Sequence, residues 1–458
     1  MTIATILVPL MMGILIFFLV INSFQALLLM CAVPELWSHW QLADDEYFQD
    51  LIGSEALPPI SVVATLRSLD DGAVAFTRML LDLDHPRFEV IIVTDGASGD
   101  GLRELGKAFD LYEVPPAFTV NFATRPVRSY YRSRAHPRLL CIDKEAGSLG
   151  DDLNAAINAA RFPHIMPAAS NVIFERDALL RLSRPFLLDR AVACVGGVAR
   201  RANISIADDG RLIFGRIRGW AVGCENVEFL RSVVFQRLGW NRMASNVAFP
   251  SGTLLFRRED FVGLGGFDPQ EATPGMDLAV RIHRYLTDIG VNARLPVIPD
   301  PVAWTVTPSD LRSIGRTRQR VLRGLIRSLS RNASMLANPE YGAFGMVAMP
   351  YLWLGLIIAP ILEVLGYLGL IIGLLAGVFD SSFTLAYLAS VVGYGILLSV
   401  WTVVFHAISF QRLDRTSDIA RLMAFAIAEA IGYRQIVAVY RATAYFAQRK
   451  QGQKNANG

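Results

Sequence analysis

The first 34 residues carry no charged side chain, and this feature constrains the fold of the chain more than any other. The apolar run over residues 3–33 is longer than the roughly 20 residues that a helix needs to cross a bilayer. A cleaved signal peptide is the alternative, but the run lacks a basic start and a small-residue cleavage site, and its apolar part is about twice the usual length. We therefore predict a transmembrane helix over residues 1–34 and a linker over residues 35–57.

Charge and cysteine content exclude several classes of protein. Lysine and arginine exceed aspartate and glutamate by only 44 − 41 = 3, which argues against a nucleic-acid-binding protein. None of the six histidines has HxxxH or HExxH spacing, so an imidazole metal site is not indicated. The four cysteines form no CxxC pair, which argues against a zinc site and a disulfide framework, and we expect them to be buried apolar residues. They are Cys31, Cys141, Cys194 and Cys224.

Residues 58–310 alternate short β-branched runs with helical patterns. Helix-like stretches cover residues 73–84, 149–161 and 277–290. Strands that alternate with helices predict an α/β domain with a mostly parallel sheet covered on both faces, and a ligand site at the carboxyl ends of the strands. The strand-like segments are ISVVAT, FEVIIVT, FTVNFAT, RLLCID, AVACVGGVA, SGTLLF and ARLPVIP.

Seven arginines follow this domain, with no acidic residue between Leu311 and Pro339. Nucleic acid is one interpretation of such a run, but the apolar segments that follow favour a basic helix over residues 311–342 on an anionic membrane surface. Residues 353–379 and 383–410 are almost uncharged and predict two membrane helices, within residues 343–410, joined by a turn at Asp380. Glu363 lies inside the first of them, and we expect it near the helix end, where either a functional role or pairing and snorkelling would account for it.

The distribution of arginines predicts the topology. Arginines precede and follow the helix pair, whereas the N-terminal tail has none, so the positive-inside rule places the globular domain in the cytoplasm. This arrangement is that of a multi-pass protein of a bacterial inner membrane. Residues 411–458 contain a last helical stretch whose charges favour an interfacial helix over a spanning one.

Several segments occur in the order seen in one enzyme family. The opening PPISVVATLRSLDDG…FEVIIVTDGASGDG, the stretch KEAGSLGDDLNAAINAAR, the segment ASNVIFERDALLRL, the turn SGTLLFRREDFVGLGGFDP and the C-terminal EAIGYRQ are similar to motifs of membrane-bound family 2 glycosyltransferases. The resemblance spans nearly the whole chain and implies the GT-A (Rossmann-like) fold of the branch that makes polysaccharides or glycolipids. Such enzymes use a nucleotide-diphosphate sugar as donor.

The resemblance also shows which catalytic residues are replaced. The family holds a divalent cation, Mg²⁺ or Mn²⁺, with a DxD carboxylate pair, and these positions read Ala169-Ser170-Asn171 here. The Glu-Asp motif that supplies the family's general base is replaced by Pro274 and Gly275. Asp277 is the fallback base, although a helix N-terminal role is favoured for it. We predict no metal site at these positions, and a cation only if other ligands exist.

Other family positions keep part of their chemistry. The resemblance assigns donor binding to Asp95, Asp151 and Asn171. It assigns acceptor or diphosphate binding to Ser251, Gly252, Arg320 and Arg323. In the QxxRW motif the arginine, Arg320, survives while the glutamine and tryptophan are lost. Glu175 and Asp177 are expected to be first-turn acids of a helix.

Three hypotheses follow. The first is a degenerate glycosyltransferase that acts as a partner or regulatory subunit of an active synthase in a surface-polysaccharide or glycolipid pathway. The second is an active, inverting, metal-independent enzyme in which arginines such as Arg320 or Arg323 neutralise the diphosphate and Asp277 or Asp177 is the base. The third is a lipid-binding scaffold. The expected partners are membrane lipids, an active synthase and a nucleotide sugar, and not nucleic acid.

Overall fold

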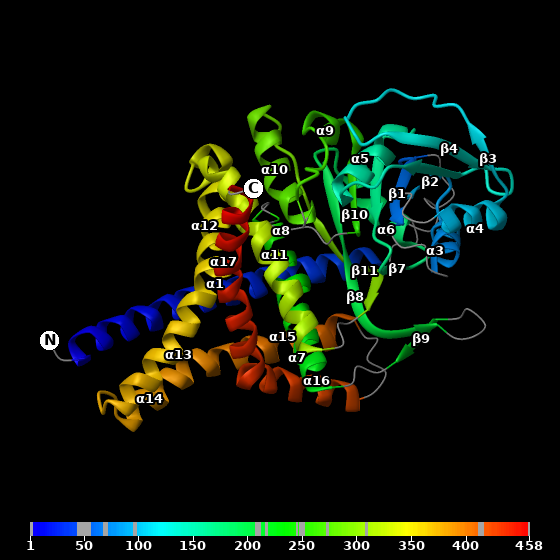
Figure 1. Cartoon of the computed structure of the whole chain (residues 1–458). Coiled ribbons are helices and arrows are strands. Elements are labelled where there is room, and N and C mark those ends of the chain that lie inside the picture. The colour runs from blue at the N-terminus through cyan, green and yellow to red at the C-terminus, as the bar shows by residue number, and fades with distance from the viewer. Residues whose placement is uncertain are drawn as a thin grey trace. The chain divides into compact units, whose positions relative to one another are not determined.

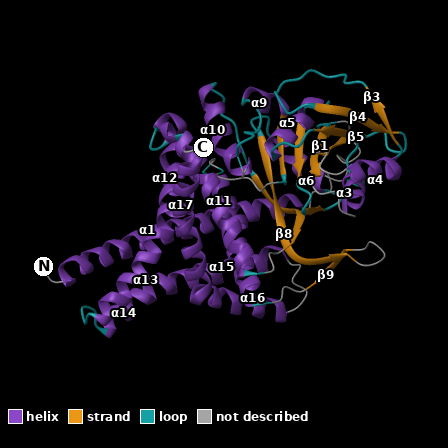
Figure 2. Ribbon diagram, viewed as in Figure 1, coloured by secondary structure: helices purple, strands orange, loops and turns teal. Residues whose placement is uncertain are grey.

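The computed structural model describes residues 3–43, 56–66, 72–94, 99–206, 212–215, 219–243, 246, 252–271, 274–306, 310–410 and 416–456. The chain divides into two compact units. One, over residues 38–202 and 244–306, holds the sheet. The other combines residues 1–37, 203–243 and 307–458 and is almost wholly helical (Figure 2).

The α/β unit contains one mixed sheet in the order β3-β4-β5-β2-β1-β6-β10-β8-β11-β7. Off this path, β9 pairs with the end of β8, within residues 203–243 of the other unit. The four central strands β5, β2, β1 and β6 are mutually parallel, whereas β3, β4, β10 and β7 pair antiparallel with their neighbours. The strands are β1 (Ile60–Leu66), β2 (Phe88–Thr94), β3 (Leu111–Val114), β4 (Val127–Ser133), β5 (Leu139–Lys144), β6 (His164–Ala168), β7 (Val172–Phe174), β8 (Cys194–Ile206), β9 (Leu212–Gly215), β10 (Leu254–Arg257) and β11 (Val297–Val306).

Helices cover both faces of this sheet (Figure 1). Alternate residues of β1, Val62 and Ala64, join a buried cluster with α3, α4 and α6, while α5 packs on the other side of β1 and β2. Successive side chains of each strand point to opposite faces of the sheet, and helices cover both faces. Most residues of the central strands are therefore apolar. The helices of this unit are α3 (Gly72–Leu81), α4 (Gly99–Phe109), α5 (Leu149–Ala159), α6 (Ala178–Leu188), α9 (Arg258–Gly263) and α10 (Pro274–Asp288). The predicted α/β class is confirmed.

One strand prediction is wrong. Residues 118–124, FTVNFAT, form no strand; they lie in the irregular connection between β3 and β4. The actual strand is β4, VRSYYRS, whose two arginines and two serines hid its alternating pattern. Phe122 is buried within the irregular connection, so one aromatic anchor accounts for the apolar appearance of this segment.

Among the residues that the structure describes, the helical unit contains four helices that are long and apolar enough to cross a membrane, over Ile3–Trp37, Phe344–Leu375, Ser381–Ile408 and Asp418–Tyr445. Its helices are α1 (Ile3–Ala43), α7 (Trp220–Phe229), α8 (Gln236–Arg242), α11 (Leu311–Arg331), α12 (Met349–Tyr351), α13 (Ala359–Leu375), α14 (Ser381–Leu388), α15 (Tyr394–Phe410), α16 (Thr416–Ala428) and α17 (Arg434–Ala456). Short π-helical segments connect several of them: η1 (Leu230–Phe235), η4 (Phe344–Ala348), η5 (Leu352–Ile358), η6 (Ala389–Gly393) and η7 (Glu429–Tyr433). Two 3₁₀ turns, η2 (Ala333–Met335) and η3 (Pro339–Tyr341), follow α11.

Glycines let α1 and α13 approach closely in antiparallel directions. A Cβ atom on Gly369 would lie 2.7 Å from the Met11 sulfur, and one on Gly373 would lie 3.1 Å from Leu7. Small residues at such spacing allow membrane helices to pack backbone against side chain. The N-terminal helix and the predicted helix pair therefore share one apolar core.

The C-terminal segment is helical, as expected, but it is broken. Ile431 and Gly432 have non-helical backbone angles, so α16 and α17 are separate helices. Although residues 418–445 are apolar and long enough to span, α16 alone has 13 residues, a length of about 20 Å, which is short of the roughly 30 Å hydrocarbon layer. The predicted interfacial placement of this segment stays a prediction.

Candidate functional site

The turn Ala169-Ser170-Asn171 follows β6 directly, where parallel strands end. The Val172 amide donates to the Ala169 carbonyl at 3.0 Å and closes the turn. Asn171 is exposed and Ala169 is partly exposed. The turn that holds Asn171 therefore lies at the carboxyl end of β6, the edge at which ligands bind in open α/β folds, and the assignment of Asn171 to donor binding stays a prediction.

Gly252 lies against this turn. Its φ is +89°, and a Cβ atom added there would lie only 2.8 Å from the Ala169 Cβ. Both the positive φ and the close approach require glycine. The structure thus brings together Gly252 and Ala169, two positions that the sequence places 83 residues apart. Asp95 and Ser251 lie outside the described residues, and their assignments stay predictions.

The donor atoms at this turn do not fit a hard divalent cation. Ala169 has no ligand atom, and Asn171 offers a single neutral carbonyl oxygen, whereas Mg²⁺ and Mn²⁺ sites are built from carboxylates. Within the part of the chain that the structure describes, no group of three or more His, Cys, Asp or Glu side chains is placed to hold a metal ion.

Asp151 is held inside the framework. The ammonium of the fully buried Lys144 lies 2.5 Å from Asp151 Oδ2 and 2.8 Å from Asp152 Oδ1. The other oxygen of Asp151 accepts from the Arg125 amide at 3.0 Å. Since a buried ammonium needs acidic partners, these contacts give Asp151 a structural task at the start of α5.

Two asparagines on the same helix fix neighbouring loops. Asn154 donates to the Phe267 carbonyl and accepts from the Phe267 amide, both at 2.9 Å. Asn158 makes the same pair of bonds with Phe122, at 2.9 and 3.0 Å. Each amide side chain acts as a two-pronged backbone clamp, so α5 positions the loops on either side of it.

Asp277, the fallback base, is buried in the first turn of α10. Its Oδ2 lies 3.3 Å from Arg281 Nη1. The same guanidinium donates to the carbonyls of Gly266 and Leu264 at 2.9 Å. Asp277 therefore orients an arginine that holds the turn after α9.

Glu175 and Asp177, the two acids that follow β7, also accept hydrogen bonds from side chains of the same unit. The Trp304 indole donates to Glu175 at 2.6 Å. Asp177 precedes α6 and receives two bonds from Arg181, at 2.9 and 2.5 Å. The expectation that these two acids lie in the first turn of a helix is wrong, because α6 begins at Ala178 and its first turn contains no acidic residue. Both carboxylates instead contact partners in the same unit.

The arginines of α11 divide between two faces. Arg312, Arg316, Arg320 and Arg327 are exposed on one face, at the spacing of a single helical stripe, and the partly exposed Arg323 lies on the same side. Arg323 Nε donates to the Gln319 carbonyl at 3.3 Å. A neighbouring face packs on α17, where a Cβ atom on Gly315 would overlap the Tyr440 ring and Gln319 donates to the Thr443 hydroxyl at 3.0 Å.

Arg318 points the other way, into a buried ionic network that the sequence did not reveal. Its Nη2 lies 3.0 Å from both Glu225 Oε2 and Glu228 Oε2 of α7. Arg441 of α17 donates to Glu228, and the Tyr433 hydroxyl donates to Glu225. Burial raises the pKa of Glu228, but Arg318, Arg441 and Arg231 outweigh it and hold that pKa well below its ordinary value.

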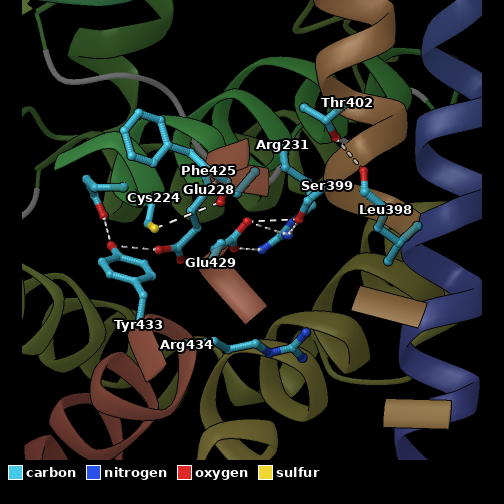
Figure 3. A network of polar contacts seen from close by, with 12 residues as sticks. Cys224, Glu228, Arg231, Leu398, Ser399, Thr402, Phe425, Glu429, Tyr433 and Arg434 are labelled. Carbon is cyan, nitrogen blue, oxygen red and sulfur yellow. Dashed lines mark hydrogen bonds and ion pairs between the residues drawn. The ribbon is translucent and has the colours of Figure 1, made fainter. Parts of the chain in front are cut away.

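A second cluster is centred on Glu429 (Figure 3). Arg231 lies 2.7 Å from Glu429 Oε1, and Ser399 of α15 donates to Glu429 Oε2 at 2.8 Å. Close by in sequence, Arg434 Nε lies 3.0 Å from Glu363 Oε1. Glu363 is twelve residues, roughly 18 Å, from the end of α13 at Leu375, so it is paired deep within a candidate span and not at its end.

The break between α16 and α17 lies between Glu429, which belongs to the second cluster, and Tyr433, which belongs to the first network. Gly432 has a φ of +90°. The side chain of Gln435 accepts from the Gly432 amide at 2.7 Å and donates to the Ala430 carbonyl at 3.0 Å, which satisfies backbone groups that the break leaves open. The segment EAIGYRQ thus supplies Glu429, Tyr433, Arg434 and Gln435 to separate partners. The segment was recognisable in the sequence, but its partners on other helices were not.

The thiols behave as expected of buried groups in three of four cases. Cys141, Cys194 and Cys224 are buried and Cys31 is partly exposed. Burial raises the pKa of Cys141 to about 12, so this thiol stays protonated and unreactive at neutral pH.

A comparison with solved structures finds similarity to the mannosyltransferase PcManGT from Pyrobaculum calidifontis in complex with GDP-Man and Mn²⁺. The two chains are 15% identical with a TM-score of 0.48, and the match covers 90% of this chain and 99% of that chain. No protein-family model matches this sequence, and no curated protein is found to be similar to it. At this level of identity, the likeness concerns the fold alone.

Proposed function

We propose that the chain is a membrane-anchored, glycosyltransferase-like protein that has lost catalysis and acts as a partner or regulatory subunit in a surface-polysaccharide or glycolipid pathway. The observation that carries the proposal is the turn after β6. The positions that resemble the family's metal-binding acids hold Ala169 and Asn171, and Ala169 lies against Gly252. A methyl group there cannot neutralise a leaving diphosphate.

The placement of the remaining acids supports the same proposal. Asp151, Asp177 and Asp277 are each paired with a cation of their own unit. A general base must be able to take up a proton from the acceptor, and an ion pair with a buried lysine or an arginine opposes protonation. These three acids therefore support the structure of the glycosyltransferase-like scaffold.

The topology belongs to the proposal as well. Arginines of α11 and of residues 412–421 flank the helix pair, and the N-terminal segment has no basic residue. We place the α/β unit on the cytoplasmic side of a bacterial inner membrane, with membrane lipids and an active synthase as partners.

An active, metal-independent transferase is the second candidate. The exposed stripe of α11, with Arg320 at its centre, favours it because arginines can neutralise a diphosphate without a metal. This candidate needs a carboxylate base that is released from its ion pair.

The experiment is a titration of the detergent-purified full chain with a panel of nucleotide-diphosphate sugars that includes UDP-glucose and GDP-mannose, with and without Mg²⁺ or Mn²⁺, together with a turnover assay. We expect no turnover and no effect of metal on donor affinity. An Ala169→Asp/Asn171→Asp variant should gain metal-dependent donor binding, and Asn121→Asp, an added acid on an exposed loop, is its control. Metal-stimulated turnover by the unaltered chain would refute the degenerate assignment, and turnover without metal would establish the second candidate.

A further inference from the structure

Two helices of the helical unit, α11 and α17, lie side by side and share an exposed face. They run in parallel, because Gly315 packs on the Tyr440 ring and, one turn further along each helix, Gln319 donates to the Thr443 hydroxyl at 3.0 Å. Thr443 is exposed and Gln319 is partly exposed. This hydrogen bond therefore marks the line along which the exposed surfaces of the two helices meet.

The shared face combines positive charge with apolar side chains. Five arginines of α11 lie within about 80° of one another at about 100° per residue, and they extend over 15 residues, roughly 22 Å. On α17 the apolar side chains of Ile436 and Val439 are 36% and 50% exposed. The members of this arginine stripe are Arg312, Arg316, Arg320, Arg323 and Arg327.

The opposite face of the helix pair packs on α7. Arg318, roughly opposite the stripe on α11, lies 3.0 Å from both Glu225 and Glu228 of α7. Arg441, which lies on the side of α17 opposite Val439, also donates to Glu228. The glutamates of α7 are therefore on the far side of the helix pair from the stripe.

The position of α7 shows which way the shared face points. Val227 of α7 packs in an apolar cluster with Val403 of α15. Val403 is 22 residues, roughly 33 Å, from Ser381 at the start of its candidate span, so α7 lies at the far edge of a hydrocarbon layer of about 30 Å. The shared face of α11 and α17 points away from α7 and thus back towards this layer.

The level and direction of α11 agree with a place at the membrane surface. α11 contacts η5, which lies 17–23 residues, roughly 26–35 Å, from Leu375 at the other end of the same candidate span. In Figure 1, α11 and α17 both run across the direction of α1. Helices that cross a spanning helix in this way lie along the membrane plane.

We propose that the shared face of α11 and α17 binds anionic phospholipids of the adjoining leaflet. Guanidinium groups pair with phosphate oxygens, and arginines beside a spanning helix attract anionic headgroups. Ile436 and Val439 offer an apolar surface beside the stripe that suits acyl chains. The inference rests on the membrane placement in the proposed function, but not on the loss of catalysis. It gives Arg320 a lipid phosphate as its ligand in place of a donor diphosphate.

Native mass spectrometry of the delipidated full chain tests the proposal, with phosphatidylglycerol and phosphatidylcholine as probes. We expect the unaltered chain to prefer phosphatidylglycerol, and the preference to weaken as salt is raised. R312Q/R316Q/R320Q should bind phosphatidylglycerol about a hundredfold more weakly, roughly fivefold for each arginine, and phosphatidylcholine unchanged. The matched control R138Q/R176Q/R190Q removes three exposed arginines of the α/β unit and should keep the preference.

Two further arms separate lipid binding from other causes. R312K/R316K/R320K keeps the charge and should keep most of the preference. Inorganic pyrophosphate at the concentration of the lipid should not displace phosphatidylglycerol; displacement would make the stripe a site for a soluble diphosphate and overturn the proposal. Equal retention of the two lipids by the unaltered chain, or of phosphatidylglycerol by R312Q/R316Q/R320Q and its control, would also overturn it.

These measurements use no nucleotide sugar. Turnover in the donor titration would therefore refute the degenerate assignment and leave the lipid result standing, whereas loss of the lipid preference would leave the question of catalysis untouched.

Discussion

Asp151, Asn154 and Asn158 lie on successive turns of α5, and each uses its side chain to fix backbone or a buried cation. All residues of α5 from Gly150 to Ala159 are buried, so these polar groups have no access to bulk water. Their hydrogen bonds are therefore needed for folding irrespective of any ligand. At the scale of single residues, the polar side chains of a motif that resembles a donor-binding segment therefore have structural roles in this chain.

Replacement of Asn154 by alanine should destabilise the chain by about 2–4 kcal/mol, because the Phe267 amide and carbonyl both lose a buried partner. Thermal unfolding of the full chain in detergent measures the change. Asn121→Ala, which alters an exposed side chain, is the control and should change stability by less than about 0.5 kcal/mol. Equal effects of the two substitutions would contradict the clamp assigned to Asn154.

The sequence was informative where a chemical property follows from the type of residue. It was uninformative where the property depends on which side chains lie next to each other in the fold. Ala169 and Asn171 could be recognised as poor metal ligands before their positions were known. The ion pair of Asp277 with Arg281 has i,i+4 spacing within one helix, but the sequence analysis did not predict it. Lys144 and its two acids, by contrast, meet across a loop that no periodic pattern describes.

At the scale of elements, helices were easier to predict than irregular segments. The stripe of α11 follows directly from arginine spacing, because the helical repeat fixes which side chains share a face. The segment FTVNFAT misled because a single buried aromatic, Phe122, and its neighbours imitate a strand. The break at Gly432 was also missed, since glycine within an apolar stretch is common in membrane helices.

Gly432→Ala tests whether the break is required. At a φ of +90° an alanine is strained, and we expect a loss of about 1–2 kcal/mol in stability, seen as a lower unfolding temperature in detergent. Gly393→Ala is the matched control, because Gly393 lies in a helical segment with open space around its α-carbon. The control should be neutral or slightly stabilising. An alanine at 432 that is tolerated as well as one at 393 would mean that the break can straighten at little cost.

At the scale of the whole molecule, both units bury charges in ion pairs, such as that of Lys144 with Asp151 in the α/β unit. The α/β unit also buries uncharged histidines. His85, His164 and His283 each have a pKa lowered to about 4, mainly because burial disfavours the charged ring. His283 Nε2 contacts the Asn246 carbonyl at 3.0 Å, an arrangement that requires a proton on Nε2.

Stability should therefore fall in mild acid. The unfolded chain takes up protons on these histidines near pH 6.5 and the folded chain only near pH 4, so stability is complete above pH 6.5 and is lost as the pH falls towards 4. For His283 alone the loss at pH 5 is on the order of 2 kcal/mol. Unfolding temperatures of the full chain from pH 7 to pH 5 measure it, and His283→Gln should show a shallower decline. An unchanged or rising stability on acidification would contradict the burial of neutral rings.

The helical unit is assembled from three separated stretches of chain, residues 1–37, 203–243 and 307–458. Glu225, Glu228 and Arg231 are synthesised about 200 residues before Glu429, Tyr433 and Arg441, their partners near the C-terminus. A nascent chain that ends before residue 429 therefore carries Glu225, Glu228 and Arg231 without these partners, so the ionic centre can form only after residues 429–441 have been synthesised.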